Sequence, residues 1–89
     1  MMYPYLTLAD GVEITHSHLI EKDGSSIVEV HFERAIPNGF QSARCQLPDY
    51  TWKFNDGFSS DDIRFFEELL RHNAHLLFRY ASEGGMHCA

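Results

Sequence analysis

The sequence is poor in basic residues and in long apolar runs. Seven Lys and Arg residues stand against thirteen Asp and Glu residues, so the formal net charge is −6 at pH 7. An acidic surface of this kind repels phosphate groups, which argues against a nucleic-acid partner. No apolar run reaches the roughly 18 residues that a transmembrane helix needs. We therefore expect neither nucleic acid nor membrane among the partners.

Cysteine is also scarce. The chain has two cysteines, Cys45 and Cys88, which form neither a disulfide framework nor the paired motifs of a structural zinc site. We interpret both as reduced thiols. The first residues lack the basic and apolar regions of a secretory signal. These absences together favour a cytoplasmic location.

What is present is a globular composition, with 44% apolar, 22% charged and 13% aromatic residues in a chain of 89. This composition differs from that of a disordered chain. The length fits a single domain over residues 1–89.

Three turn signals divide the first half of the chain: Asp10-Gly11, Asp23-Gly24 and Asn38-Gly39. Such dipeptides favour the positive φ angles of tight hairpin turns. The segments between them have strand character, and regularly spaced hairpins predict an antiparallel meander. The predicted strands are 3–8, 12–20, 27–34 and 40–47, with a short fifth strand or extended arm at 50–54.

Alternation within the strands predicts one apolar and one charged face. From residue 28 to residue 33, apolar side chains at even positions alternate with charged or polar side chains at odd positions. This is the pattern of a sheet that is covered on a single side. On the charged face we expect Glu29 or Glu33 to pair with Arg44 across the strands.

The last third of the chain has the period of an amphipathic helix from about 60 to 82. Ser59 and Ser60 offer an N-cap, and acidic residues follow in the first turn, where the helix dipole favours them. Gly84-Gly85 provides a stop. The apolar stripe contains Ile63, Phe66, Leu69, Leu70, Leu77, Tyr80 and Ala81. The predicted fold is α+β: a four- to five-stranded antiparallel meander with one C-terminal helix packed on its apolar face.

Four histidines form two closely spaced pairs of a kind that metal sites also use. His72 and His75 lie three residues apart on the helix, with Glu68 four residues before His72. They face away from the apolar stripe, so we interpret them as solvated polar surface. His16 and His18 fall on the side of a predicted strand that should be buried. A bulge, or a position beyond the end of the covering helix, would explain why two polar histidines lie on that side. A metal site that joins both pairs is the alternative.

No pattern of nucleophilic catalysis or phosphate binding is present. Cys45 alternates with polar neighbours so that it falls on the apolar side of its predicted strand, as a core residue would. The serines at 25–26 and 59–60 fall in a turn and a helix cap. Gly84-Gly85 follows a helix and does not open one, unlike a phosphate-binding loop. We expect no enzymatic activity and no cofactor.

Three residues are candidates for partner contacts. Asn73 lies within the apolar stripe, where a buried amide must be hydrogen-bonded or cost about 1–3 kcal/mol. It either ties the helix to a neighbouring backbone or contacts a partner. Tyr50, Trp52 and Phe54 alternate with polar residues beside a sheet edge, and they either close the core or, for Tyr50 and Trp52, anchor an interface. We expect a protein partner or a homodimer on this side.

Two stretches carry a resemblance to known proteins. One runs over 31–52 and contains Arg34-Ala35-Ile36-Pro37-Asn38-Gly39-Phe40 and Leu47-Pro48-Asp49-Tyr50, and the other runs over 57–77 and opens with Gly57-Phe58-Ser59-Ser60-Asp61-Asp62-Ile63. Together they resemble small uncharacterised bacterial proteins, a domain of unknown function, with a sheet and one terminal helix. The order of elements is also similar to that of antitoxins with a partial double-stranded-RNA-binding fold. The chain differs from those antitoxins in having no basic patch and no appended DNA-binding segment, so no functional residue is carried over.

These observations predict a small acidic protein-binding or inhibitor-like module, antitoxin-like in outline. The alternative is a metal- or small-molecule-binding protein that uses the histidine pairs.

Overall fold

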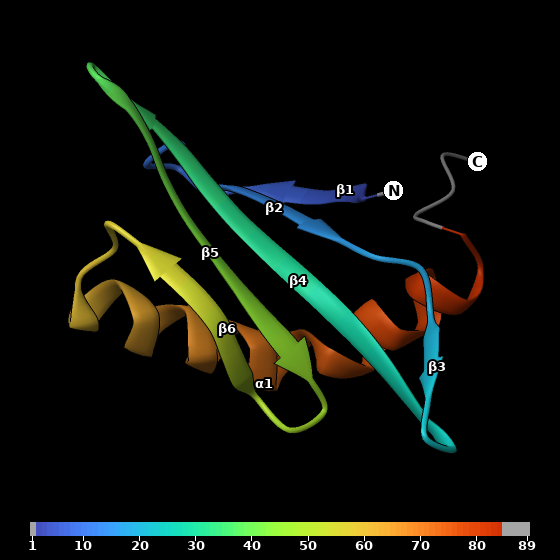
Figure 1. The fold of residues 1–89 in the computed structure, drawn as a ribbon. Coiled ribbons are helices and arrows are strands. Elements are labelled where there is room, and N and C mark those ends of the chain that lie inside the picture. The colour runs from blue at the N-terminus through green and yellow to red at the C-terminus, as the bar shows by residue number, and fades with distance from the viewer. Residues whose placement is uncertain (1, 85–89) are drawn as a thin grey trace.

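The computed structural model describes residues 2–84, so Met1 and residues 85–89, which include Gly85 of the expected helix stop and Cys88, lie outside it. The predicted α+β class is confirmed: an open antiparallel sheet is followed by one C-terminal helix (Figure 1). The elements are β1 (Tyr3–Thr7), β2 (Glu13–His16), β3 (Ile20–Lys22), β4 (Ser25–Ile36), β5 (Gly39–Leu47), β6 (Thr51–Asp56) and α1 (Ser60–Ser82). No helix of the described residues is long and apolar enough to cross a membrane.

The strands lie in the order β1-β2-β4-β5-β6, and β3 pairs with the first residues of β4. The β4–β5 hairpin is longer than its neighbours, and its tip projects beyond the rest of the sheet (Figure 1). The turn into β4 uses Asp23 at φ 50° and Gly24 at φ 79°. Two successive positive φ angles are the geometry for which Asp-Gly is selected in a two-residue hairpin.

One predicted strand is divided. The structure replaces the continuous strand over 12–20 with β2 and β3, because Ser17 receives the Glu29 amide on its side chain and the Leu19 amide bonds to α1. The Ser17 hydroxyl accepts a hydrogen bond from the Glu29 amide at 3.0 Å, and the Leu19 amide donates to the Ala81 carbonyl of α1 at 3.2 Å. A side chain that takes over a ladder bond interrupts regular pairing.

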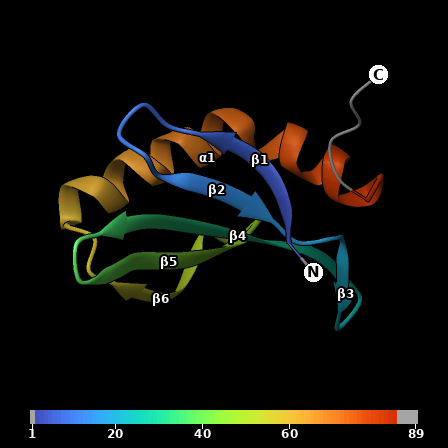
Figure 2. The same ribbon diagram turned by 90° about the horizontal axis from the view of Figure 1, so that it is seen from above.

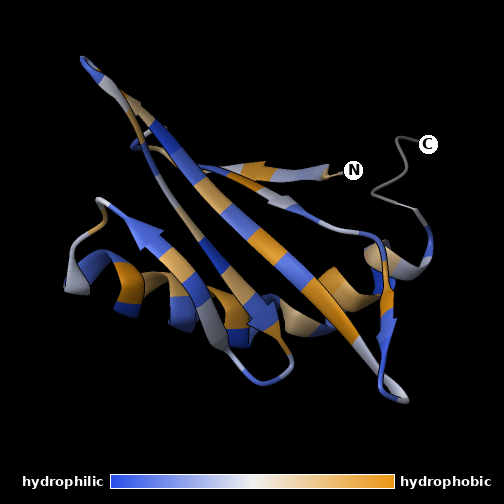
Figure 3. Cartoon of the chain, viewed as in Figure 1, coloured by the Kyte–Doolittle hydropathy of each residue, from blue (hydrophilic) through white to orange (hydrophobic). Residues whose placement is uncertain are grey.

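The core lies between α1 and the apolar face of the sheet. Alternation along β4 is visible as successive apolar and polar bands (Figure 3). The Phe32 and Phe66 rings stack with their centroids 4.3 Å apart, and Phe58 meets Phe66 edge-on at 5.0 Å. The buried cluster contains Val12, Ile14, Val28, Val30, Phe32, Ala43, Cys45, Leu47, Phe58, Phe66, Leu70, Leu77 and Ala81.

A reciprocal cap fixes the start of α1. The Asp62 amide donates to the Ser59 hydroxyl at 3.1 Å, and the Ser59 amide donates to the Asp62 carboxylate at 3.2 Å. Each bond satisfies an amide that has no partner within the helix. Just before it, Gly57 has φ 103°, and a Cβ there would lie 3.1 Å from Gln41 Cγ. Glycine therefore lets β6 turn tightly into the helix.

Both edge strands of the sheet are irregular. The pairing of β1 with β2 shifts between Pro4 and Leu6, and the pairing of β6 with β5 skips Lys53. Bulges, proline and exposed lysine are devices that discourage an edge strand from pairing with another chain. The irregular pairing therefore makes β1 and β6 poor templates for pairing with another strand.

Candidate functional site

The histidines selected from the sequence lie in different parts of the structure. His16 is buried, with its Nδ1 2.8 Å from the Ser17 carbonyl oxygen and its ring 5.6 Å from that of Tyr3. His18 is exposed because β2 ends at His16, which explains why the two do not share a face. His72 and His75 are exposed on α1. Within residues 2–84, no three His, Cys, Asp or Glu side chains are grouped to hold a metal ion.

Tyr50 and Trp52 close the seam between β6 and α1. Trp52 is half-buried, its ring lies 5.7 Å from Phe32, and its Nε1 donates to Glu67 at 2.9 Å. Tyr50 is half-buried at a positive φ of 56°, with the Arg71 guanidinium 5.6 Å from its ring centre. Both rings therefore contact other residues of the chain, as expected of side chains that close the core.

Asn73 joins the helix to the first strand. The Tyr5 hydroxyl donates to Asn73 Oδ1 at 2.5 Å, and Asn73 Nδ2 donates to the Leu69 carbonyl at 2.7 Å. The amide is half-buried, and its partner on the sheet is a side chain. Its polar atoms are thus used inside the molecule.

Replacing Asn73 with leucine should lower the free energy of unfolding by about 1–3 kcal/mol, because the Tyr5 hydroxyl loses its acceptor in a half-buried position. Urea denaturation measures the loss. The Tyr5→Phe variant and the double variant complete a cycle: the double variant should be less destabilised than the sum of the two single variants. Strictly additive losses would show that the two side chains are not coupled.

One face of the sheet is left uncovered by the described elements. In both ribbon views α1 lies on one side of the sheet, and among residues 2–84 nothing lies over the other side (Figures 1 and 2). We call this side the open face. Strand alternation and register assign to it Glu13, Thr15, Glu29, His31, Glu33, Phe40, Ser42, Arg44, Gln46, Phe54 and Asp56.

A charged network fixes the middle of the open face. Arg44 lies 3.6 Å from Glu29, which confirms the pairing expected from the sequence. Arg44 Nη2 also donates to His31 Nδ1 at 3.5 Å, and His31 Nε2 lies 3.3 Å from the Glu33 carboxylate. The Phe54 ring on the neighbouring strand β6 borders this network, with its centre 5.9 Å from the Arg44 guanidinium and 6.0 Å from the His31 ring. These side chains are held in place by one another.

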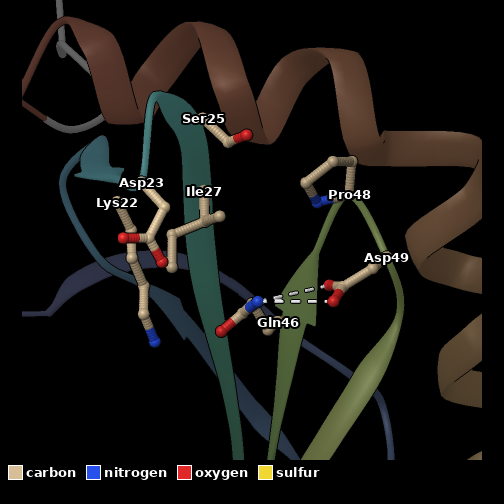
Figure 4. A pocket seen from close by; sticks show the side chains of 7 residues that line it. All are labelled: Lys22, Asp23, Ser25, Ile27, Gln46, Pro48 and Asp49. Atoms are coloured by element: carbon tan, nitrogen blue, oxygen red, sulfur yellow. Dashed lines mark hydrogen bonds between the residues drawn. The ribbon is translucent and has the colours of Figure 1, made fainter.

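One end of the open face carries a depression of about 360 Å³ between the β3–β4 and β5–β6 turns (Figure 4). Gln46 Nε2 donates to both oxygens of Asp49 at 3.4 Å, and the Thr51 hydroxyl donates to Asp49 at 2.9 Å. The Thr51 bond holds the pKa of the Asp49 carboxyl below its usual range. The lining residues are Lys22, Asp23, Ser25, Ile27, Gln46, Pro48 and Asp49. Five of these seven residues are polar or charged, and Ile27 and Pro48 are apolar.

Two phenylalanines on the open face were not selected from the sequence as contact residues. Phe54 is 42% exposed and Phe40 is 62% exposed. Simple alternation places Phe54 on the same side as Trp52, but the irregular pairing at Lys53 puts them on opposite faces. A bulge depends on how the neighbouring strand pairs, so the sequence carried no direct signal of it.

Likeness to known proteins adds no further constraint on this surface. No protein-family model, no curated protein and no solved structure matches the chain. The expected outline of a sheet with one C-terminal helix is present in the structure.

Proposed function

We propose that this chain is a small acidic protein-binding module that docks its partner on the open face. The observation that supports this most is the exposure of Phe40 and Phe54 on a sheet face over which residues 2–84 place no covering element. Aromatic side chains are enriched where proteins bind one another and frequently dominate the binding energy. A sheet with one solvated face needs no aromatic residues on that face for its own stability.

Preorganisation of the face also supports docking. Glu29, His31 and Arg44 hold one another by the contacts described above, and all three are half-buried before any partner arrives. A surface whose side chains are already ordered loses little conformational entropy on binding. The role would be that of an inhibitor or antitoxin, which acts by occupying a surface of its partner in the cytoplasm.

The alternative of metal or small-molecule binding through the histidine pairs finds less support. His16 is enclosed in the core, and His72 and His75 lie on the exposed side of α1. One saturable zinc site in calorimetry, lost in the His72→Ala, His75→Ala double variant, would favour that alternative over protein binding.

Photocrosslinking from single positions tests the proposal. A benzophenone amino acid is placed at Ser42 on the open face and, as the matched control, at His75 on the outer side of α1, in cells of the source organism. The Ser42 variant should form a discrete protein adduct and the His75 variant should not. The adducted protein, once purified, should bind the wild-type chain, and Phe54→Ser should weaken that binding by about 30-fold.

The opposite pattern would overturn the proposal. Adducts from His75 alone, adducts from neither position in correctly folded variants, or a purified partner that binds Phe54→Ser as tightly as wild type would each show that the open face is not the docking surface. Circular dichroism of each variant establishes that it is folded.

A further inference from the structure

A row of carboxylates crosses the open face. Glu13 on β2 lies directly opposite Glu33 on β4, Glu33 lies opposite Ser42 on β5, and Ser42 lies opposite Asp56 on β6. Neighbouring strands are about 4.8 Å apart, so Glu13 and Glu33 are near neighbours and Asp56 stands two strands further on. We call Glu13, Glu33 and Asp56 the acidic row.

The basic residues nearby do not neutralise the acidic row. Arg44 pairs with Glu29, and Arg34 pairs with Asp10 at 3.0 Å and reaches Asp62 at 3.9 Å. Within the described part of the chain, Glu13 and Asp56 form no ion pair and no side-chain hydrogen bond, and Glu33 contacts His31. Like charges directly opposite each other destabilise a sheet, so this arrangement costs the free chain stability.

Exposed phenyl rings border the row on both sides. Phe40 precedes Ser42 by two residues on β5, and Phe54 precedes Asp56 by two residues on β6. Because β5 and β6 are antiparallel, the two rings stand on opposite sides of the row. A segment that lies along the strands and crosses the row can therefore contact an aromatic ring on each side.

We propose that the partner presents an arginine-rich segment to the acidic row; this inference rests on the proposed function and names the chemistry of its partner. A guanidinium group forms two parallel hydrogen bonds with a carboxylate and also stacks on aromatic faces. Phe54 already lies beneath one guanidinium, that of Arg44. Carboxylates flanked by rings match arginine in both respects, whereas a lysine ammonium is a compact, strongly hydrated charge.

Other occupants match this surface less well. A second copy of the chain carries its own acidic row and a net charge of −6, so two open faces repel each other. Nucleic acids and anionic membranes are repelled for the same reason. A divalent cation is disfavoured because residues 2–84 contain no suitable grouping of ligands.

Fluorescence anisotropy with defined peptides tests the inference. The probe is a labelled peptide in which arginine alternates with alanine, compared with the same peptide carrying lysine. One variant of the full chain neutralises the row with Glu13→Gln, Glu33→Gln and Asp56→Asn. Its control removes the same number of charges from α1 and its C-cap with Asp61→Asn, Glu68→Gln and Glu83→Gln.

The row variant should bind the arginine peptide about 30-fold more weakly than wild type, and the helix variant should stay within about threefold of wild type. Phe54→Ser should weaken the binding of the arginine peptide more than the binding of the lysine peptide, because the guanidinium loses the ring on which it stacks. Equal losses in the row and helix variants, or no binding by wild type, would overturn the inference.

The two proposals fail separately. A partner crosslinked from Ser42 that contacts the face without basic residues, and binds the row variant as tightly as wild type, would overturn the arginine inference and leave the module intact. Absence of any adduct from the open face would overturn the proposed function itself, independently of the result of the peptide-binding assay.

Discussion

Replacing Phe66 with alanine should lower the free energy of unfolding by about 3–5 kcal/mol. The Phe66 ring is 2% exposed, stacks on Phe32 at 4.3 Å, and meets Phe58 edge-on at 5.0 Å. Its removal loses the buried area and leaves a cavity where α1 meets the sheet. A domain of this size buries only a modest fraction of its surface, so its free energy of unfolding is small. The expected loss would be a large part of that free energy.

Phe65 is the matched control for this substitution. It is the preceding residue on the same helix and is 56% exposed, so Phe65→Ala should change the free energy of unfolding by less than about 1 kcal/mol. Urea denaturation followed by Trp52 fluorescence and by circular dichroism measures both variants. Similar losses in the two variants would show that the stacked rings do not form the centre of the core.

The thiol of Cys45 should react about a thousandfold more slowly with alkylating reagents than an ordinary thiol, because the thiolate is the reactive form. Burial, followed by the nearby charges of Glu67 and Asp49, raises its pKa from 9.0 to about 12. The rate is measured in a Cys88→Ser background, which leaves Cys45 as the single thiol. In urea the rate should rise to that of a free cysteine; a fast reaction of the native protein would contradict the expected burial.

The same shift predicts a loss of stability in alkali. The folded chain favours the neutral thiol of Cys45, so the thiol of the unfolded chain ionises at a lower pH. The stabilisation from this thiol is therefore complete below pH 9.0 and is lost as the pH rises toward about 12. Burial, with a smaller effect of Tyr80, also raises the pKa of Tyr5, which acts in the same direction above pH 10.0. Urea midpoints of Cys45→Ala should therefore decline less steeply with pH than those of wild type.

Local signals in the sequence were sufficient for the helix and the meander. Ser59 and the acidic residues after it determine where α1 begins, and the cap depends on residues three positions apart. The three Gly-containing turns likewise act within a few residues. The division of the second strand could not be predicted in this way, because it depends on Ser17 bonding to Glu29 and on Leu19 reaching Ala81 of the helix.

The candidate site was harder to predict than the fold, for a related reason. Alternation predicted that Glu29 or Glu33 would pair with Arg44, and the structure shows Glu29 as the partner, since both strands are regular there. It failed across Lys53, where irregular pairing turns Phe54 to the open face and leaves Trp52 in the core. One local irregularity thus decides which aromatic residue is exposed on the open face.

The order of the elements also has a consequence for how the chain is made. Within residues 2–84 all strands precede α1, and α1 covers the apolar face of the sheet. During synthesis the strands leave the ribosome while the helix is still being assembled, so Val30, Phe32 and Cys45 have nothing to pack against at that stage. Nascent chains with uncovered apolar surface are prone to aggregate. The apolar face of the sheet should therefore stay uncovered until α1 has also left the ribosome, and during that interval the nascent chain is a natural client of chaperones that bind unfolded chains.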